Sequence, residues 1–328
     1  MQQTSLLFAA RAAPAPIVER ASLEELVALA NDYAVDVHAK ATQRAYLSDY
    51  RSFEAWCQGR GLASLPAEPA TVAVYLAALA QEGKRPSTIQ RALAGIAHTH
   101  RTSGVAWARG PSAIGPVMRG IRRRHGTAPA QKAPLGDGEL AALVATLGEG
   151  LVGLRDRALL TLGWMGAFRR SELVALDVGD VTHTSEGLVV RVNRSKSDQE
   201  GRGGEKGIPC ASDLALCPVR ALAAWLDAAG ITSGALFRGI NRFGRVQTDA
   251  LSDRSVARIV QRAAAAAGLD PATVAGHSLR AGFMTTAARN GRSLKAIMAQ
   301  SLHRSERVAR SYIRHAGVFD DNAAAGLV

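Results

Sequence analysis

The last third of the chain carries side chains that could bind and attack a phosphate diester. His277 and Arg280 lie three residues apart, and Tyr312 follows His303 by nine residues. The planar guanidinium of arginine can hold two phosphate oxygens at once and stays protonated at any working pH. A phenol, with a pKa of about 10, becomes a nucleophile when nearby cations and a base help it ionise. Together these residue types predict attack of a phenol on phosphorus.

A second group lies about a hundred residues upstream. Arg169 and Glu172 fall three apart on an expected helix end, so they share one face; Arg169 and Arg280 could together neutralise a pentavalent phosphorane. Lys196 follows an expected strand on a glycine-rich turn and could donate a proton to a leaving oxygen. Each of these residues alone also occurs in surface ion pairs, helix caps or exposed loops. The ordered set in one basic protein favours the chemical interpretation.

Composition points to a polyanionic partner. The 328 residues carry a formal net charge of +12, and 47% are hydrophobic, which is ample for folded cores. Cys57, Cys210 and Cys217 lack metal-ligand spacing, so we expect reduced, buried thiols in a cytoplasmic protein. No apolar run approaches the roughly 18 residues that a membrane span needs. We therefore expect a soluble protein that does not bind or span a membrane.

The chain divides into two expected domains. Residues 1–20 contain Ala-Pro-Ala-Pro and resemble a flexible lead, and residues 21–124 show helical periodicity. Residues 125–134 contain two prolines and a glycine, the composition of a linker. Residues 135–328 form the second domain. We expect a mainly α protein, with an all-helical first domain and an α-rich second domain that contains a small antiparallel sheet.

In the first domain we expect one basic side that faces nucleic acid. Tyr46, Tyr50, Phe53 and Cys57 form one apolar stripe of a helix, whose other face is polar. Further helices are expected at 71–81, 86–102 and 117–124. An ordinary solvated helix face remains the alternative for each polar side. The candidate DNA-binding residues are Thr42, Gln43, Arg44, Arg91, Arg119, Arg122 and Arg123.

The second domain should bring its chemistry-bearing residues together from helices and one hairpin. The β-branched run 188–192 predicts a strand, and residues 206–209 can return as its partner. The remaining chain predicts helices at 137–147, 152–164, 214–229, 253–267, 278–290, 293–300 and 305–313.

These motifs resemble those of the tyrosine recombinases, the phage-integrase superfamily. Residues 166–173 resemble its first arginine box, residues 276–282 its His-x-x-Arg box, and 195–201 its hairpin lysine segment. The nine-residue separation of His303 and Tyr312 is also that of the family. In the first domain, 66–69, 88–90 and 117–122 resemble the core-binding domain of Cre-type recombinases. The resemblance covers most of the chain.

The resemblance implies a role for each motif residue. Arg169, His277, Arg280 and His303 would bind the scissile phosphate. Glu172 would orient the site and tune His277, Lys196 would be the general acid, and Tyr312 the nucleophile. Arg170 is the rival of Arg169, but Arg169 alone has the family's offset to the acidic residue. The chain departs from the family pattern at Leu302, where a glycine is usual, which puts the local turn geometry in question.

The resemblance also implies a biology. It predicts site-specific recombination of double-stranded DNA through a 3′-phosphotyrosyl intermediate and a Holliday junction, without metal, ATP or other cofactor. Two protomers would bind an inverted-repeat site and four would form the synapse, with a C-terminal helix at 317–328 docking into a neighbour. A bacterial or phage-type, nucleoid-associated protein would fit. A non-catalytic basic DNA-binding protein and a type IB topoisomerase-like nicking-closing enzyme remain the alternatives.

Overall fold

The computed structural model describes residues 39–105, 113–127, 132–193 and 203–313, together with Ser22, Leu23, Glu25, Leu26 and Leu29. The chain forms two compact units, Met1–Pro129 and Ala130–Val328. The expected lead at 1–20, Lys196 and the expected docking helix at 317–328 lie outside the described residues.

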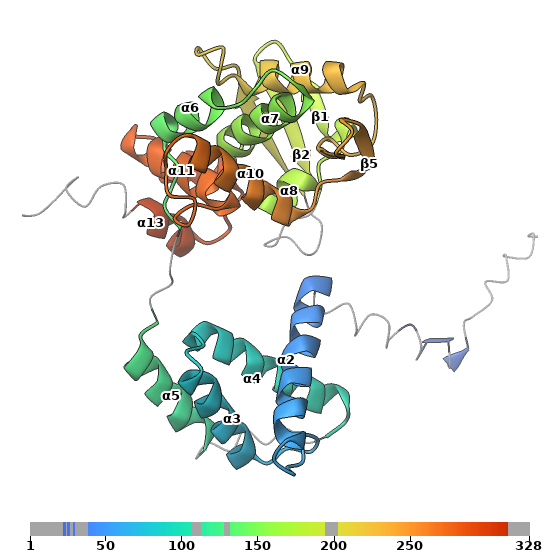
Figure 1. The fold of residues 1–328 in the computed structure, drawn as a ribbon, viewed down its shortest axis with the longest axis vertical. Helices are drawn as coiled ribbons and strands as arrows, with labels where there is room; N and C mark the ends of the chain where they lie inside the picture. Colours follow the sequence, from blue (N-terminus) through green and yellow to red (C-terminus); the bar gives the residue numbers. More distant parts are fainter. Residues whose placement is uncertain are drawn as a thin grey trace, which may run out of the picture. The chain divides into compact units, whose positions relative to one another are not determined.

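The described part of the first unit is helical (Figure 1), and its long helices are α2 (Lys40–Gln58), α3 (Pro69–Gln81), α4 (Pro86–Thr102) and α5 (Ile114–His125). Helices α3 and α4 each begin with a proline. The proline lacks a backbone N–H, but the N–H of a first helical residue makes no intrahelical hydrogen bond, so none is lost. The predicted stripe on α2 is confirmed for Tyr50, Phe53 and Cys57, which are buried in the core of this unit, whereas Tyr46 is half-buried. That core also takes apolar side chains from α3, α4 and α5.

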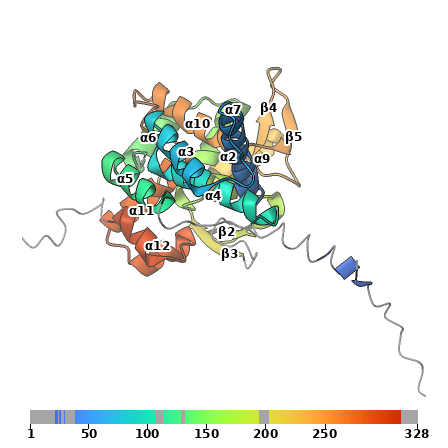
Figure 2. The same cartoon turned by 90° about the horizontal axis from the view of Figure 1, so that it is seen from below.

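The second unit is built around α7 (Leu151–Met165), which is buried along most of its length. Helix α7 packs against α9 (Pro218–Ala229), α11 (Gly276–Arg289) and α6 (Asp137–Ala145). Helix α12 (Leu294–Ser301) lies beside α11 (Figure 2), and α13 (Glu306–Ile313) packs against both. The remaining helical elements are α8 (Arg170–Val174), η1 (Val178–Asp180) and α10 (Asp253–Ala266).

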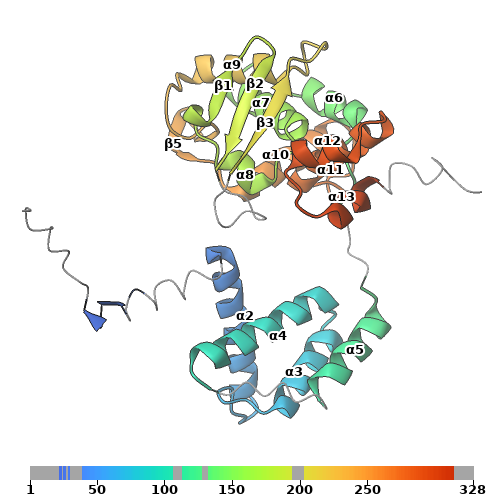
Figure 3. The same cartoon turned by 180° about the vertical axis from the view of Figure 1, so that it is seen from behind.

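An antiparallel sheet completes the second unit (Figure 3), with β2 (Gly187–Val192) between β1 (Val181–His183) and β3 (Gly204–Pro209). The predicted strand at 188–192 and its partner at 206–209 are confirmed, with Val190 opposite Lys206. The mainly α fold with a small antiparallel sheet is therefore confirmed.

A second hairpin was not expected. Strands β4 (Arg238–Ile240) and β5 (Val246–Ala250) pair between the predicted helices at 214–229 and 253–267, where no element was assigned. Strand β5 is largely exposed, so it lacks the apolar alternation by which a half-buried strand is found in a sequence. The cysteine prediction also needs a correction: Cys57 and Cys217 are buried, but Cys210 is exposed because it follows the end of β3. Among the described helices, none is both long and apolar enough to cross a membrane.

Candidate active site

The turn between α7 and α8 gives the site its shape. Ala167 has a φ of 47°, in the left-handed region that costs an L-residue roughly 1–2 kcal/mol. This conformation lets the carbonyl oxygen of Ala167 accept a hydrogen bond of 2.6 Å from Nη1 of Arg280. Two segments more than a hundred residues apart in sequence are thereby joined at one backbone atom.

Glu172 orients Arg169 across the first turn of α8. Arg169 is the N-cap residue of this helix, and its backbone N–H donates to Oε2 of Glu172 at 3.0 Å. Its Nη1 donates to Oε1 of the same carboxylate at 2.5 Å. The predicted sharing of one face by Arg169 and Glu172 is confirmed. Because the Glu172 side chain has no exposed surface, this pair fixes the guanidinium from the protein interior.

Arg170, the rival of Arg169, is placed differently. Its guanidinium is 3.7 Å from Asp253, with 41% of the side chain exposed. The aliphatic part of Arg170 crosses Gly276, where a Cβ would lie 2.4 Å from its Cδ. Arg170 therefore lies at the edge of the group formed by Arg169 and Glu172, and among the described residues it has no buried carboxylate as its partner.

Arg280 is the most deeply buried cation predicted for the site. Its side chain has no exposed surface, and Nη1 lies 3.9 Å from Oε2 of Glu172. Burial, with the nearby charge of Arg169, lowers the pKa of Arg280 to about 10, so the guanidinium stays charged at neutral pH. Among the described residues, its buried Nε finds no hydrogen-bond acceptor.

His303 is held as a neutral acceptor. Ser301 Oγ donates to the carbonyl of Ile297 at 2.6 Å, so its oxygen is left to accept from Nδ1 of His303 at 2.8 Å. Nε2 then accepts from Nη2 of Arg280 at 3.1 Å. Burial, and next the charge of Arg280, lowers the pKa of His303 to about 3.

Leu302 adopts the conformation for which glycine is usually required. It caps α12 with φ 52° and ψ 41°, which directs the chain into His303. Its side chain lies over Gly204 of β3, where a Cβ would come within 2.9 Å of Leu302 Cδ2. The left-handed turn therefore forms at Leu302 although this residue is not glycine. The Leu302 side chain fits because Gly204 has no side chain to clash with it.

Tyr312 and His277 meet at the mouth of this group. The Tyr312 hydroxyl lies 2.7 Å from Nε2 of His277, although the two residues are 35 apart in sequence. Burial raises the pKa of Tyr312, while Arg280 and Arg169 oppose that rise. The Tyr312 ring centroid is also 5.8 Å from that of His303.

These side chains line one cavity of about 590 Å³. It is an electropositive cavity, because several arginines and two histidines face a single carboxylate, that of Asp253. Its lining consists of Arg169, Arg170, Ser171, Asp253, Ala275, His277, Arg280, His303, Arg304, Ser305, Val308 and Tyr312. The structure thus brings together Arg169, His277, Arg280, His303 and Tyr312, with Glu172 behind them; Lys196 lies outside the described residues.

One buried lysine of this region was missed from the sequence. Lys206 on β3 is 1% exposed, and its Nζ donates to the carbonyl of Gly166 at 2.6 Å. It also lies 3.9 Å from Glu172 Oε2. A signal existed: in Glu205-Lys206-Gly207-Ile208, the period of two puts Lys206 on the same face as the buried Ile208.

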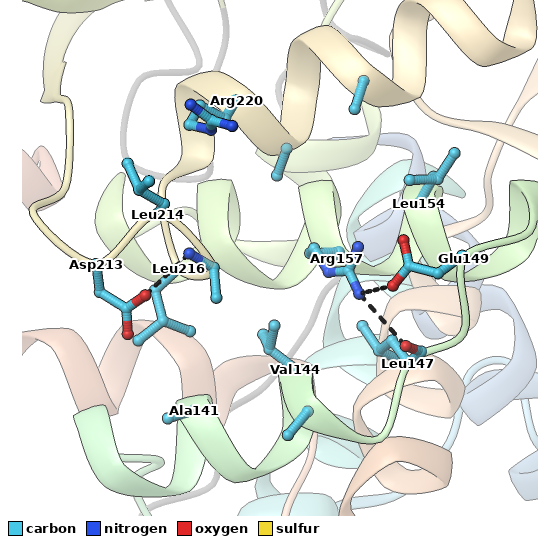
Figure 4. Close-up of a pocket in the computed structure, with 14 residues that line it drawn as sticks. Ala141, Val144, Leu147, Glu149, Leu154, Arg157, Asp213, Leu214, Leu216 and Arg220 are labelled. Atoms are coloured by element: carbon cyan, nitrogen blue, oxygen red, sulfur yellow. Dashed lines mark hydrogen bonds and ion pairs between the residues drawn. The ribbon is translucent and has the colours of Figure 1, made fainter.

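A second hollow of about 570 Å³ lies among α6, α7 and the segment that leads into α9 (Figure 4). Its lining is mostly alkyl, and Arg157 is already paired there with Glu149 at 3.1 Å. In the described part of the chain, this hollow lacks the cluster of arginines, histidines and a tyrosine that lines the first cavity. Within the described ranges, no group of three or more His, Cys, Asp or Glu side chains is arranged to hold a metal ion.

The candidate DNA-binding residues lie on three helices of the first unit. On α2, Arg44 is exposed, while Thr42 and Gln43 are half-buried. Arg91 on α4 pairs with both carboxylate oxygens of Asp49, at 2.8 and 3.0 Å.

Helix α5 supplies the remaining three candidates, Arg119, Arg122 and Arg123, and all are exposed. Arg122 donates to Gln90 on α4 at 2.6 Å, one residue before Arg91. Arg91 is therefore oriented by Asp49 on α2, and Arg122 by Gln90 on α4.

Comparison with known proteins agrees with this geometry. The profile of the Phage integrase family matches residues 135–317. The chain is 42% identical over 290 residues to the integrase/recombinase xerD homolog of Selenomonas ruminantium, covering 87% of this chain and 84% of that protein. It is 26% identical over 293 residues to the recombinase cre of Escherichia phage P1, covering 84% of each.

The fold is similar to that of a lambda integrase dimer crystallised on a COC′ core site, with a TM-score of 0.59 and 18% identity. That match covers 89% of this chain and 77% of the other. The family match spans more than half of the chain and includes every residue of the cavity. The chain belongs to the phage integrase family, the tyrosine recombinases, enzymes that break and rejoin DNA at specific sites.

Proposed function

We propose that the protein recombines double-stranded DNA through a covalent bond between Tyr312 and a DNA 3′ phosphate. The observation that carries this proposal is the 2.7 Å contact between the Tyr312 hydroxyl and His277 at the mouth of a cavity lined by Arg169, Arg280 and His303. This arrangement supports Tyr312 as the nucleophile, His277 as the proton acceptor, and the arginines of the cavity as the cations that hold a phosphate diester.

In the proposed step, the phenol oxygen forms a bond to phosphorus and the bond to the 5′ oxygen breaks. His277 takes the phenol proton, and Lys196 supplies a proton to the departing 5′ oxygen. Arg169 and Arg280 stabilise the charge that develops on the non-bridging oxygens. The phosphotyrosyl ester retains the energy of the broken diester, so religation to a 5′ hydroxyl needs neither ATP nor a metal.

We assign the domains in the same terms. Residues 21–124 bind DNA through Thr42, Gln43, Arg44, Arg91, Arg119, Arg122 and Arg123, residues 125–134 link the domains, and residues 135–328 hold the catalytic site. The exposed arginines of α5 and the net charge of +12 support a duplex partner. The crystallised lambda integrase is a dimer on its core site, which supports two protomers per site here.

We further propose four protomers in the synapse, exchange through a Holliday junction, and docking of residues 317–328 into a neighbour. These assignments distinguish a recombinase from a nicking-closing enzyme, which acts on one duplex. Strand-exchanged product that forms from two sites, and not from one, supports the recombinase.

The test uses a duplex taken from the flanks of the native gene and nicked beside the cleavage point, so that the cut strand cannot religate. Incubation without metal should give wild type a covalent protein–DNA band on a denaturing gel. Tyr312→Phe should bind the duplex and give no band. Tyr50→Phe, whose hydroxyl lies in the first unit 3.4 Å from Ser64, should behave as wild type. Tight binding by wild type with no covalent band would refute the proposal in favour of a non-catalytic DNA-binding protein.

A further inference from the structure

Lys206 is a charged residue whose side chain is buried in the second unit. It lies on β3 opposite Val190, and its side chain has no exposed surface. Its Nζ sits 4.4 Å above the ring of Phe168. Replacing buried charges by apolar side chains of similar size is often neutral or stabilising, so packing alone does not account for a lysine here.

The atoms that Lys206 contacts all belong to the stretch that places the two arginines. Nζ donates to the carbonyl of Gly166 at 2.6 Å and lies 3.4 Å from that of Ala167. The Ala167 carbonyl is also the acceptor of Arg280 Nη1. Lys206 therefore supports, from the interior, the same left-handed turn that Arg280 contacts.

Glu172 is shared in the same way. Its Oε2 is 3.9 Å from Lys206 and 3.9 Å from Arg280, and its Oε1 accepts from Arg169. One carboxylate thus balances three cations, only two of which line the cavity. Burial lowers the pKa of Lys206 to about 7, although Glu172 opposes that fall.

We propose that Lys206 is a positioning residue for cleavage: it holds the Gly166–Ala167 carbonyls and the Glu172 carboxylate so that Arg169 and Arg280 face the scissile phosphate. This inference rests on the proposed function. Because Lys206 does not line the cavity, it acts through Glu172 and the turn and does not touch the DNA.

The test separates positioning from binding and from stability. Lys206→Met removes the charge and keeps the length, Lys206→Gln keeps an N–H donor for the carbonyls, and Lys295→Met removes an exposed lysine of α12 as the control. Single-turnover formation of the covalent band is measured beside DNA affinity and thermal unfolding. A displacement of about 1 Å at a reacting centre can cost roughly 100-fold in rate. We expect Lys206→Met to slow the covalent step by about that factor with affinity within about threefold of wild type, Lys206→Gln to recover part of the rate, and Lys295→Met to match wild type.

A double variant shows whether Lys206 acts through Glu172. If it does, Lys206→Met combined with Glu172→Gln should be no slower than the slower single variant, because both break one arrangement. Multiplied effects, an unchanged rate in Lys206→Met, or failure of both neutral variants to fold would each overturn the inference. The wild-type covalent band reports separately on the proposed function, which stands or falls without Lys206.

Discussion

The carboxylate of Glu172 should make a large electrostatic contribution to the stability of the second unit. Its side chain is fully buried, and its partners Lys206 and Arg280 are fully buried too. Glu172→Gln keeps the shape and an oxygen that can still accept from the backbone N–H of Arg169. The change removes the negative charge and puts an amide N–H donor in place of Oε1, the acceptor of Arg169 Nη1, so the cations lose their counter-ion.

The expected loss follows from the cost of leaving a buried charge unpaired. Breaking a buried ion pair by removing one partner costs about 3–5 kcal/mol. Because the amide oxygen of the Glu172→Gln variant would still accept the cap hydrogen bond, we expect the lower end, about 3 kcal/mol of unfolding free energy. For a unit of this size, that loss lowers Tm by roughly 6–12 °C.

The loss should also depend on pH. The pKa of Lys206 is lowered to about 7 by burial, so Lys206 is charged at pH 6 and neutral at pH 9. At pH 9 the variant leaves one fewer buried cation without its counter-ion, and the destabilisation should be smaller than at pH 6. Arg280, with a pKa of about 10, stays largely charged at both values and keeps part of the effect.

The assay is thermal and urea unfolding of wild type, Glu172→Gln and Glu205→Gln at both pH values. Glu205 neighbours Lys206 on β3 but is exposed, so its variant controls for a lost carboxylate on the same strand. We expect Glu205→Gln to stay within about 0.5 kcal/mol of wild type. A Glu172→Gln loss below about 1 kcal/mol, or one that grows from pH 6 to pH 9, would refute the reasoning.

Three further predictions concern other parts of the molecule. Gly204→Ala should slow covalent-band formation, because the added Cβ would meet Leu302 at 2.9 Å and displace the neighbouring His303. In a Leu302→Gly background the same change should have little effect on the rate. Equal effects in both backgrounds would contradict this coupling between Gly204 and Leu302. The folded-state pKa of His303 is about 3 against 6.5, so its contribution to stability is complete above pH 6.5 and is lost as pH falls towards 3. His303→Phe should therefore make the free energy of unfolding fall less steeply between pH 6.5 and 4, by up to about 1 kcal/mol per pH unit after allowance for partial exposure. An unchanged slope would argue against a neutral, buried imidazole. DNA affinity should fall steeply with salt, and Arg123→Gln should reduce the log–log slope by about 0.9 if Arg123 neutralises one phosphate; a flat wild-type response would contradict the proposed grip on duplex DNA.

Much of the fold and part of the site could be predicted because they depend on local periodicity. Spacings of three place Arg169 beside Glu172 at the N-terminus of α8 and His277 with Arg280 on α11, since helical geometry fixes such neighbours. The β-branched run of β2 and the basic residues of α5 are also local signals. The order of the motifs was enough to indicate a nucleophilic tyrosine in a DNA-cleaving protein.

Tertiary structure decided what the local patterns leave open. No periodicity relates Tyr312 to His277, Lys206 to Gly166, or Asp49 to Arg91, because these contacts join segments that only folding brings together. The positive φ angles of Ala167 and Leu302 likewise depend on their surroundings. Arg280 donates to the carbonyl of Ala167, and the space above Gly204 accommodates the Leu302 side chain. The sequence by itself determined which groups the site contains, and only the tertiary structure decided their charge states and partners, because desolvation and ion pairing depend on every element packed around them.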